Sequence, residues 1–132
     1  MTEPHERWLD KAEDDLRFAE LGLKEGFYSQ VCFLSQQAAE KSLKAYLVFK
    51  GEVYPKTHKL TDLGSVCAKL SGNFSKFFED FRILDEFYIP TRYPDAAPGS
   101  LKDSAPSKKR AEEALKIAHK VLSHTKTAVT GK

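Results

Sequence analysis

The stretch QVCFLSQQAAEKSLKAYLVFK, residues 30–50, decides the fold, because it reads as one long helix that is apolar on most of its circumference. The middle of this helix nevertheless carries polar side chains at spacings of three and four residues, which brings them together on one face. They are Gln36, Gln37, Glu40, Lys41 and Lys44. The segment is therefore either a core helix with one solvated seam or a core helix that presents a functional site.

The 132 residues are enough for one domain, residues 1–132, with its own hydrophobic core. Apolar residues make up 41% and charged residues 30%, which suits a soluble globular chain. No apolar run approaches the roughly 20 residues that cross a bilayer, and the first residues lack a signal-peptide pattern. We therefore expect a cytoplasmic protein. Cys32 and Cys67 lie in helical apolar patterns without a CxxC spacing, which predicts buried thiols.

The charges are distributed unevenly, although the net charge of +2 is too small to indicate nucleic-acid binding by itself. Residues 1–25 contain eight acidic and four basic residues, whereas residues 102–132 contain eight basic and three acidic ones. One interpretation is that an acidic first helix and a basic last helix lie side by side and attract each other. The alternative is a basic face for phosphate groups. The alternation of both signs within each segment favours the first interpretation.

Apolar periodicity predicts helices over residues 5–25 and from about residue 29 to residue 51, the first ended by Gly26. The link between them is so short that the two helices must be antiparallel neighbours. A third, shorter helix carries Leu60, Leu63, Cys67 and Leu70 on one face and is broken by residues 71–73. Thr57 or His58 stands near its start.

A fourth helix is predicted from an aromatic stripe at helical spacing, ended by Pro90: Phe74, Phe77, Phe78, Phe81, Leu84 and Tyr88. Residues 89–106 then form a long proline-rich connection of the kind that is usually functional or mobile. The last helix begins between Ser104 and Ser107 and frays from Thr127. No period-two strand pattern occurs, so the expected fold is an all-α, antiparallel up-and-down bundle of four long helices and one short helix.

The second helix is apolar on more faces than a single bundle core requires. This excess indicates either a central position in the bundle or burial in a subunit interface. From it we predict a homodimer.

Most standard catalytic signatures are absent from the sequence, including a glycine-rich phosphate loop, HExxH and a G-x-S-x-G elbow. His119 and His124 are five residues apart on one helix and so do not share a face well. We therefore predict neither a metal site nor a cofactor.

The remaining candidates are His58, the group Glu40, Lys41 and Lys44, and the residues Arg92, Tyr93 and Asp95. Taken separately, each has a structural explanation. His58 could bond the start of the third helix, Glu40 and Lys44 form an ordinary i, i+4 pair, and Arg92 and Asp95 could pin the connection. Taken together, they also supply phosphate-binding cations, a proton carrier and a ring that can stack on a base.

Two segments, SQQAAEKSLKAYLVFKGEVYPKTHKLTDL at residues 35–63 and YIPTRYPD at residues 88–95, resemble the HEPN domain family of prokaryotes. The name stands for higher eukaryotes and prokaryotes nucleotide-binding. The resemblance covers the chain from Trp8 to about Leu122. It implies a four- or five-helix bundle, usually a symmetric dimer. Many members are encoded beside a minimal nucleotidyltransferase and form a two-component system with it.

Some members of the family are RNases, which use an arginine, a polar residue directly after it and a histidine one or two helical turns further on, brought together across the dimer. This chain departs from that pattern. Arg92 is followed by Tyr93 and Pro94, and no histidine occurs between Arg92 and His119. Arg82 and Arg110 also lack a suitably placed histidine.

These observations lead to the hypothesis of a nucleotide- or RNA-binding accessory protein that works with a minimal nucleotidyltransferase. In this hypothesis Arg92 and Lys44 hold phosphate and Tyr93 contacts a base. Glu40 and Asp95 orient the cations, and Lys41 and His58 line the same groove. One alternative is a metal-independent endoribonuclease of a toxin–antitoxin type system, with Arg92 and His58 as the catalytic pair. A second alternative is a module that only binds other proteins.

Overall fold

The computed structural model describes residues 3–88 and 106–131, and every regular element in these two ranges is helical. The long helices are α1 (Pro4–Glu25), α2 (Tyr28–Phe49) and α5 (Lys108–Thr130). The shorter elements are α3 (Leu60–Leu70), the 3₁₀ helix η1 (Gly72–Phe77) and α4 (Phe78–Asp85). The prediction of an all-α bundle is thereby confirmed.

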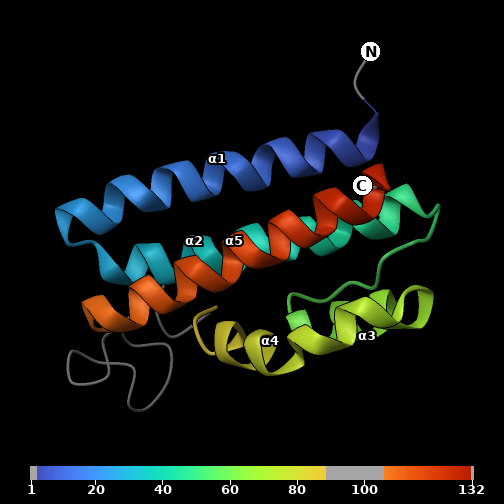
Figure 1. Ribbon diagram of the computed structural model, residues 1–132. Helices are drawn as coiled ribbons and strands as arrows, with labels where there is room; N and C mark the ends of the chain where they lie inside the picture. Colours follow the sequence, from blue (N-terminus) through green and yellow to red (C-terminus); the bar gives the residue numbers. More distant parts are fainter. Residues whose placement is uncertain (1–2, 89–105, 132) are drawn as a thin grey trace.

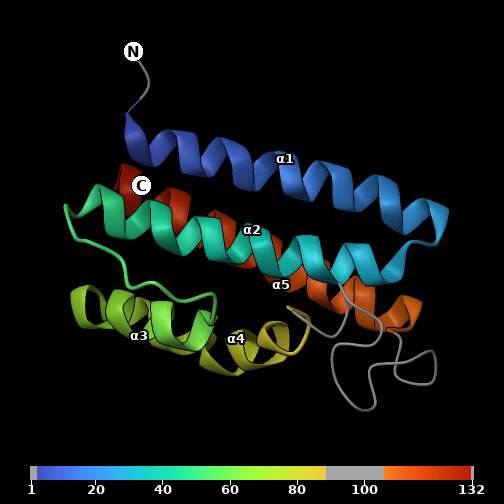
Figure 2. The same cartoon turned by 180° about the vertical axis from the view of Figure 1, so that it is seen from behind.

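The helices form three layers (Figure 1). Helices α2 and α5 lie in the middle, α1 covers one side of them, and α3 and α4 cover the other side, as the view from behind also shows (Figure 2). Helix α2 contacts α1, α3, α4 and α5. This central position accounts for the apolar character of α2 on several faces, because each face packs against a different neighbour.

Local sequence signals set the helix boundaries. Helix α1 begins with a capping box in which Glu3 and Glu6 satisfy each other's backbone amides, and it ends at Gly26 with φ +85°. The side chain of Ser107 accepts a hydrogen bond from the amide of Arg110 at 3.1 Å and so begins α5. Helix α5 continues to Thr130 and ends at Gly131 with φ +74°, so the expected fraying from Thr127 does not occur within the described residues.

The fourth helix differs from its predicted length. The segment starts as a 3₁₀ turn in which the Ser71 hydroxyl accepts from the amide of Asn73, and the α-helix begins only at Phe78. The aromatic stripe still faces the core, because three residues per 3₁₀ turn place Phe74 and Phe77 on the same side. Within residues 3–88 and 106–131 the helices are thus three long ones, two short ones and the 3₁₀ helix η1, and the long fourth helix expected from the sequence is divided between η1 and α4.

The oppositely charged first and last helices are adjacent, as the charge distribution predicted. Lys126 of α5 forms an ion pair with Glu13 of α1, and His119 Nε2 lies 3.6 Å from Glu20 Oε2. These pairs are exposed and contribute little stability.

Cys32 and Cys67 are buried free thiols, and burial raises the pKa of each to about 12. None of the described helices is both long and apolar enough to cross a bilayer.

Helices α3 and α4 pack so closely that their contact excludes a side chain at residue 64. A Cβ added at Gly64 would lie 2.7 Å from Phe81 Cδ2, and the Phe81 ring is fully buried. We expect Gly64→Ala to lower the free energy of unfolding in urea by about 1–3 kcal/mol through overpacking, although alanine is the better helix former. The neighbouring exposed change Ser65→Ala is the control and should be nearly neutral; equal unfolding midpoints for the two variants would contradict the tight contact.

Candidate functional site

The polar seam of α2 is organised around the buried carboxylate of Glu40, whose side chain is only 6% exposed. Glu40 Oε2 accepts from Lys44 Nζ at 2.8 Å and lies 3.1 Å from His58 Nδ1. Glu40 Oε1 accepts from Gln37 Nε2 at 3.3 Å and from Gln36 Nε2 at 3.5 Å. A buried carboxylate is costly unless charge and hydrogen bonds compensate it, and these four partners do so. We refer to the five residues as the Glu40 network.

His58 lies in the loop between α2 and α3 and is the exposed member of this network, with 59% of its side chain accessible. Its backbone carbonyl accepts from Gln36 Nε2 at 2.9 Å. Its ring stacks on the Tyr88 ring, with centroids 4.7 Å apart and planes inclined by 14°. Because an ionised carboxylate can only accept a hydrogen bond, the contact with Glu40 assigns a proton to Nδ1 of His58.

Lys44 has a different environment from the one expected of a phosphate ligand. Its ammonium is paired with Glu40 and lies over two aromatic rings, 5.5 Å from the centroid of Trp8 and 5.0 Å from that of Tyr54. Cation–π contacts of this kind strengthen when the ammonium is desolvated. In this structure Lys44 therefore neutralises Glu40 and ties α1 and the loop to α2.

The other predicted site residues fall into two groups. Lys41 points toward α1, where its Nζ lies 2.6 Å from Asp15 Oδ2, so its contacts lie outside the Glu40 network. Arg92, Tyr93 and Asp95 lie outside the described residues.

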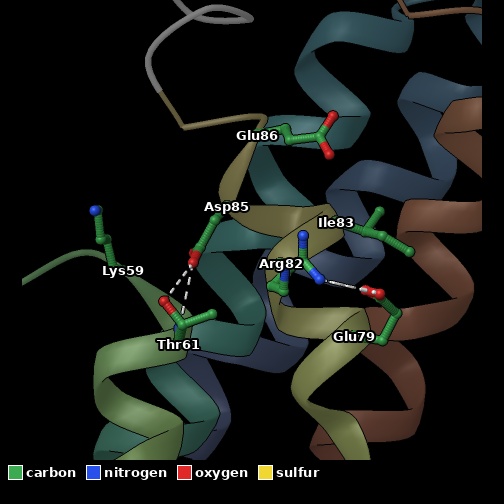
Figure 3. Close-up of a pocket in the computed structure, with 7 residues that line it drawn as sticks. All are labelled: Lys59, Thr61, Glu79, Arg82, Ile83, Asp85 and Glu86. Carbon is green, nitrogen blue, oxygen red and sulfur yellow. Dashed lines mark hydrogen bonds and ion pairs between the residues drawn. The ribbon is translucent and has the colours of Figure 1, made fainter.

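Asp85, at the end of α4, holds the start of α3 and was not expected from the sequence. Its carboxylate accepts from the amide of Leu60 at 2.7 Å, from the amide of Thr61 at 3.2 Å and from the Thr61 hydroxyl at 3.1 Å (Figure 3). Lys59 occupies the N-cap position of α3, but its side chain makes no capping hydrogen bond. The Asp85 carboxylate therefore caps α3 in its place. His58 lies two residues before Leu60, so Asp85 holds the turn that directly follows His58.

The hollow beside Asp85 has a volume of about 350 Å³, and charged side chains of both signs line it. The lining residues are Lys59, Thr61, Glu79, Arg82, Ile83, Asp85 and Glu86. Figure 3 shows Asp85 directed at Thr61 and Arg82 directed at Glu79, to which it is paired at 3.2 Å. The cations are matched by acidic groups, so this hollow does not suit a polyanion.

The two histidines of α5 lie apart from the Glu40 network. The His124 ring packs edge-on against Phe74 and Phe77, and burial, with Lys76 nearby, lowers the pKa of His124. His119 is exposed beside Glu20. Within residues 3–88 and 106–131, no cluster of three or more histidine, cysteine, aspartate or glutamate side chains is arranged to hold a metal ion.

Comparison with known proteins identifies the family to which this chain and its fold belong. Residues 5–127 match the model of the HEPN domain, so the chain belongs to the HEPN domain family. It is similar to TT1696 from Thermus thermophilus, with 35% identity, 95% of this chain and 98% of that chain covered, and a TM-score of 0.80. It is also similar to ST0689, an archaeal HEPN homologue, with 30% identity, 97% and 99% covered, and a TM-score of 0.77.

A further relative is a protein of Methanocaldococcus jannaschii named "Putative toxin MJ1304". It is 28% identical over 123 residues, which cover 87% of this chain and 81% of that protein.

The cap from Asp85 is tested by removing its carboxylate. We expect Asp85→Ala to lower the free energy of unfolding by about 1–2 kcal/mol and to speed hydrogen exchange at the amides of Leu60 and Thr61. The ¹⁵N signals of the His58 ring should also move, because the loop that holds His58 against Glu40 is loosened. Asp85→Asn, which keeps an acceptor oxygen, should show a smaller change, whereas unchanged His58 signals in Asp85→Ala would contradict the positioning role.

Proposed function

We propose that this HEPN protein binds a nucleotide, or the end of an RNA, at the ring pair formed by the exposed His58 and the half-buried Tyr88, and that it works with a minimal nucleotidyltransferase. The observation that carries the proposal is the His58 imidazole, which is exposed, stacked on Tyr88 and hydrogen-bonded to a buried carboxylate. Stacked aromatic rings are a common platform for unpaired bases.

The phosphate group in this proposal is held by Arg92. Residue 92 follows Tyr88 by four residues, a length of chain that spans at most about 14 Å when fully extended. Arginine binds phosphate in bidentate fashion. Tyr93 is proposed to contact the base and Asp95 to orient Arg92, while Glu40 orients His58 and Lys44 supports Glu40 from the buried side.

The proposed protein partners are those typical of the HEPN family, and the geometry of this structure does not identify them. HEPN proteins are often dimeric, and we propose a homodimer for this chain as well. The proposed nucleotidyltransferase should be encoded beside this protein and should co-purify with it.

Ligand binding is tested by calorimetric titration with ATP and with a short single-stranded RNA. We expect His58→Ala and Arg92→Ala each to weaken ligand binding at least about tenfold, because each variant loses one stacking contact or one charge-assisted hydrogen bond to the ligand. Arg82→Ala is the matched control, because Arg82 is an exposed arginine paired with Glu79. Equal affinities for all four proteins, or no binding by the unaltered protein, would contradict the proposal.

A second candidate function is metal-independent RNA cleavage, favoured by the contact of 3.1 Å between Glu40 and His58. A carboxylate that holds Nδ1–H of an imidazole leaves Nε2 free to accept a proton. In this reaction His58 takes the proton of a 2′-hydroxyl, the 2′-oxygen attacks the adjacent phosphorus, and the 5′-oxygen leaves and takes a proton from water. The products are a 2′,3′-cyclic phosphate and a 5′-hydroxyl. The name of the M. jannaschii relative is consistent with a toxin of this type.

Cleavage is tested by incubating the protein with RNA in the presence of a chelator. This function predicts 2′,3′-cyclic phosphate ends, a loss of at least about a hundredfold in rate for His58→Ala, as expected for a general base, and a smaller loss for Glu40→Gln. Arg82→Ala should cleave normally. Intact RNA, or cleavage by the His58→Ala variant at the normal rate, would exclude this function. Ligand binding would still be decided separately by the calorimetric titration.

A further inference from the structure

The side-chain amide of Gln36 has a single possible orientation in the Glu40 network, because two of its neighbours can only accept hydrogen bonds. An ionised carboxylate and a backbone carbonyl have no proton to donate. Gln36 Nε2 must therefore donate to the His58 carbonyl, at 2.9 Å, and to Glu40 Oε1, at 3.5 Å. Gln36 Oε1 is left to accept from Gln37 Nε2 at 2.7 Å. A flipped amide would set oxygen against oxygen at the first two contacts.

Gln36 and Glu40 hold the same loop residue at two points. They are four residues apart on α2 and so are neighbours on one face of the helix. Gln36 bonds the backbone of His58, and Glu40 bonds its ring through Nδ1 at 3.1 Å. A ring as exposed as that of His58 exchanges a single hydrogen bond with water at little cost. The bond from Gln36 fixes the backbone of the same residue against α2 and removes much of that freedom.

Gln36 is fully buried, unlike the ring that it supports. Burying an amide costs free energy unless its donors and its acceptor are paired, and those of Gln36 are. Such pairing is not general in the bundle. Within the part of the chain that the structure describes, Ser35 Oγ, His124 Nε2 and Thr125 Oγ1 are buried without a hydrogen-bond partner. The complete pairing of Gln36 is therefore a local feature, and fully paired buried networks are rigid.

We propose that Gln36 is a positioning residue of the candidate site, which holds the His58 ring with its proton on Nδ1 and a free lone pair on Nε2. The inference rests on the proposed ligand binding at the His58–Tyr88 ring pair and adds the residue that sets how the imidazole is presented there. Gln36 is buried and so acts through His58 rather than by touching a ligand. The tautomer matters because an unprotonated Nε2 accepts a hydrogen bond from a hydroxyl or amino group, whereas Nε2–H cannot.

The ring of His58 reports this role in the protein without ligand. Long-range ¹H–¹⁵N spectra at about pH 9, where imidazoles are neutral, show which ring nitrogen carries the proton. The His58→Ala variant identifies the His58 signals among those of the four histidines. We expect the proton on Nδ1 in the unaltered protein, because Glu40 accepts from that atom.

Gln36→Met keeps the length of the side chain and removes its donors. The ratio of Nδ1–H to Nε2–H for His58 should fall about fivefold, the change in an equilibrium that one hydrogen bond accounts for. Gln36→Leu, which also brings no polar atom into the buried position, should give the same change and replaces Gln36→Met if that variant does not fold. In the titration with ATP, Gln36→Met should weaken binding by less than His58→Ala does, because the ring is still present.

Gln37→Met is the matched control. Gln37 is the neighbouring glutamine of α2, and its side-chain amide donates to Gln36 and to Glu40 Oε1. It loses hydrogen bonds of the same network but none to the His58 backbone. Both variants should unfold at a lower temperature than the unaltered protein, whereas only Gln36→Met should change the His58 tautomer. This difference separates a positioning role from a general effect on stability.

Each outcome decides the proposal. A proton on Nε2 of His58 in the unaltered protein overturns it, as does an unchanged tautomer in folded Gln36→Met or Gln36→Leu. An equal change in Gln37→Met also overturns it. A changed tautomer with unaltered affinity for ATP and RNA overturns the role of Gln36 in the ligand site. If the unaltered protein binds neither ATP nor RNA, the proposed function fails, and the tautomer measurement still decides whether Gln36 positions the ring.

Discussion

The burial of the Glu40 carboxylate is the constraint on which the candidate site depends. An ionised carboxylate inside a bundle is stable only when cations and hydrogen-bond donors replace the lost water. Lys44 on the same helix supplies the opposite charge, Gln36 and Gln37 supply amide donors, and His58 supplies a donor from the loop. The loop before α3 is thereby held against α2 by electrostatics, and an imidazole is fixed at the solvent edge of an otherwise buried network.

The fold makes this arrangement possible by surrounding α2 with other helices. Because α2 packs against four of them, Glu40 and its partners can face the one gap that the α2–α3 loop closes, while Lys41 turns toward α1 and pairs with Asp15. Asp85 then closes the loop from the opposite direction by capping α3. In the His58–Tyr88 stack, Glu40 contacts the His58 ring directly, whereas Asp85 holds the backbone of Leu60 and Thr61, just after His58. One buried carboxylate therefore positions the His58 ring directly and a second holds the turn beside it, which is the structural basis of the proposed ligand site.

The sequence predicts the helices of this fold better than the long-range contacts between them. The boundaries at Gly26 and Ser107 depend on neighbouring residues, and the pair Glu40–Lys44 is set by helical spacing, so both are visible in the sequence. The contacts of Asp85 with Leu60 and Thr61 join residues 25 and 24 positions apart and follow from helix packing, which no local pattern encodes. The same holds for Lys41, whose spacing suited the Glu40 network but whose direction on the helix leads to Asp15. The break at Phe78 was hidden because a 3₁₀ turn keeps an aromatic stripe on one face.

The expectation of a homodimer illustrates why the location of apolar surface matters more than its amount. The sequence argument relied on the surplus of apolar residues on α2, but the bundle buries most of them, and the central position of α2 explains these without a subunit interface. Among the described residues, large apolar side chains are exposed on several elements: Phe18 and Leu21 on α1, Phe27 in the link, Phe49 at the end of α2, Val53 in the following loop and Leu70 at the end of α3. Most of the exposed apolar surface therefore lies outside α2, so the surplus on α2 does not by itself indicate a subunit interface.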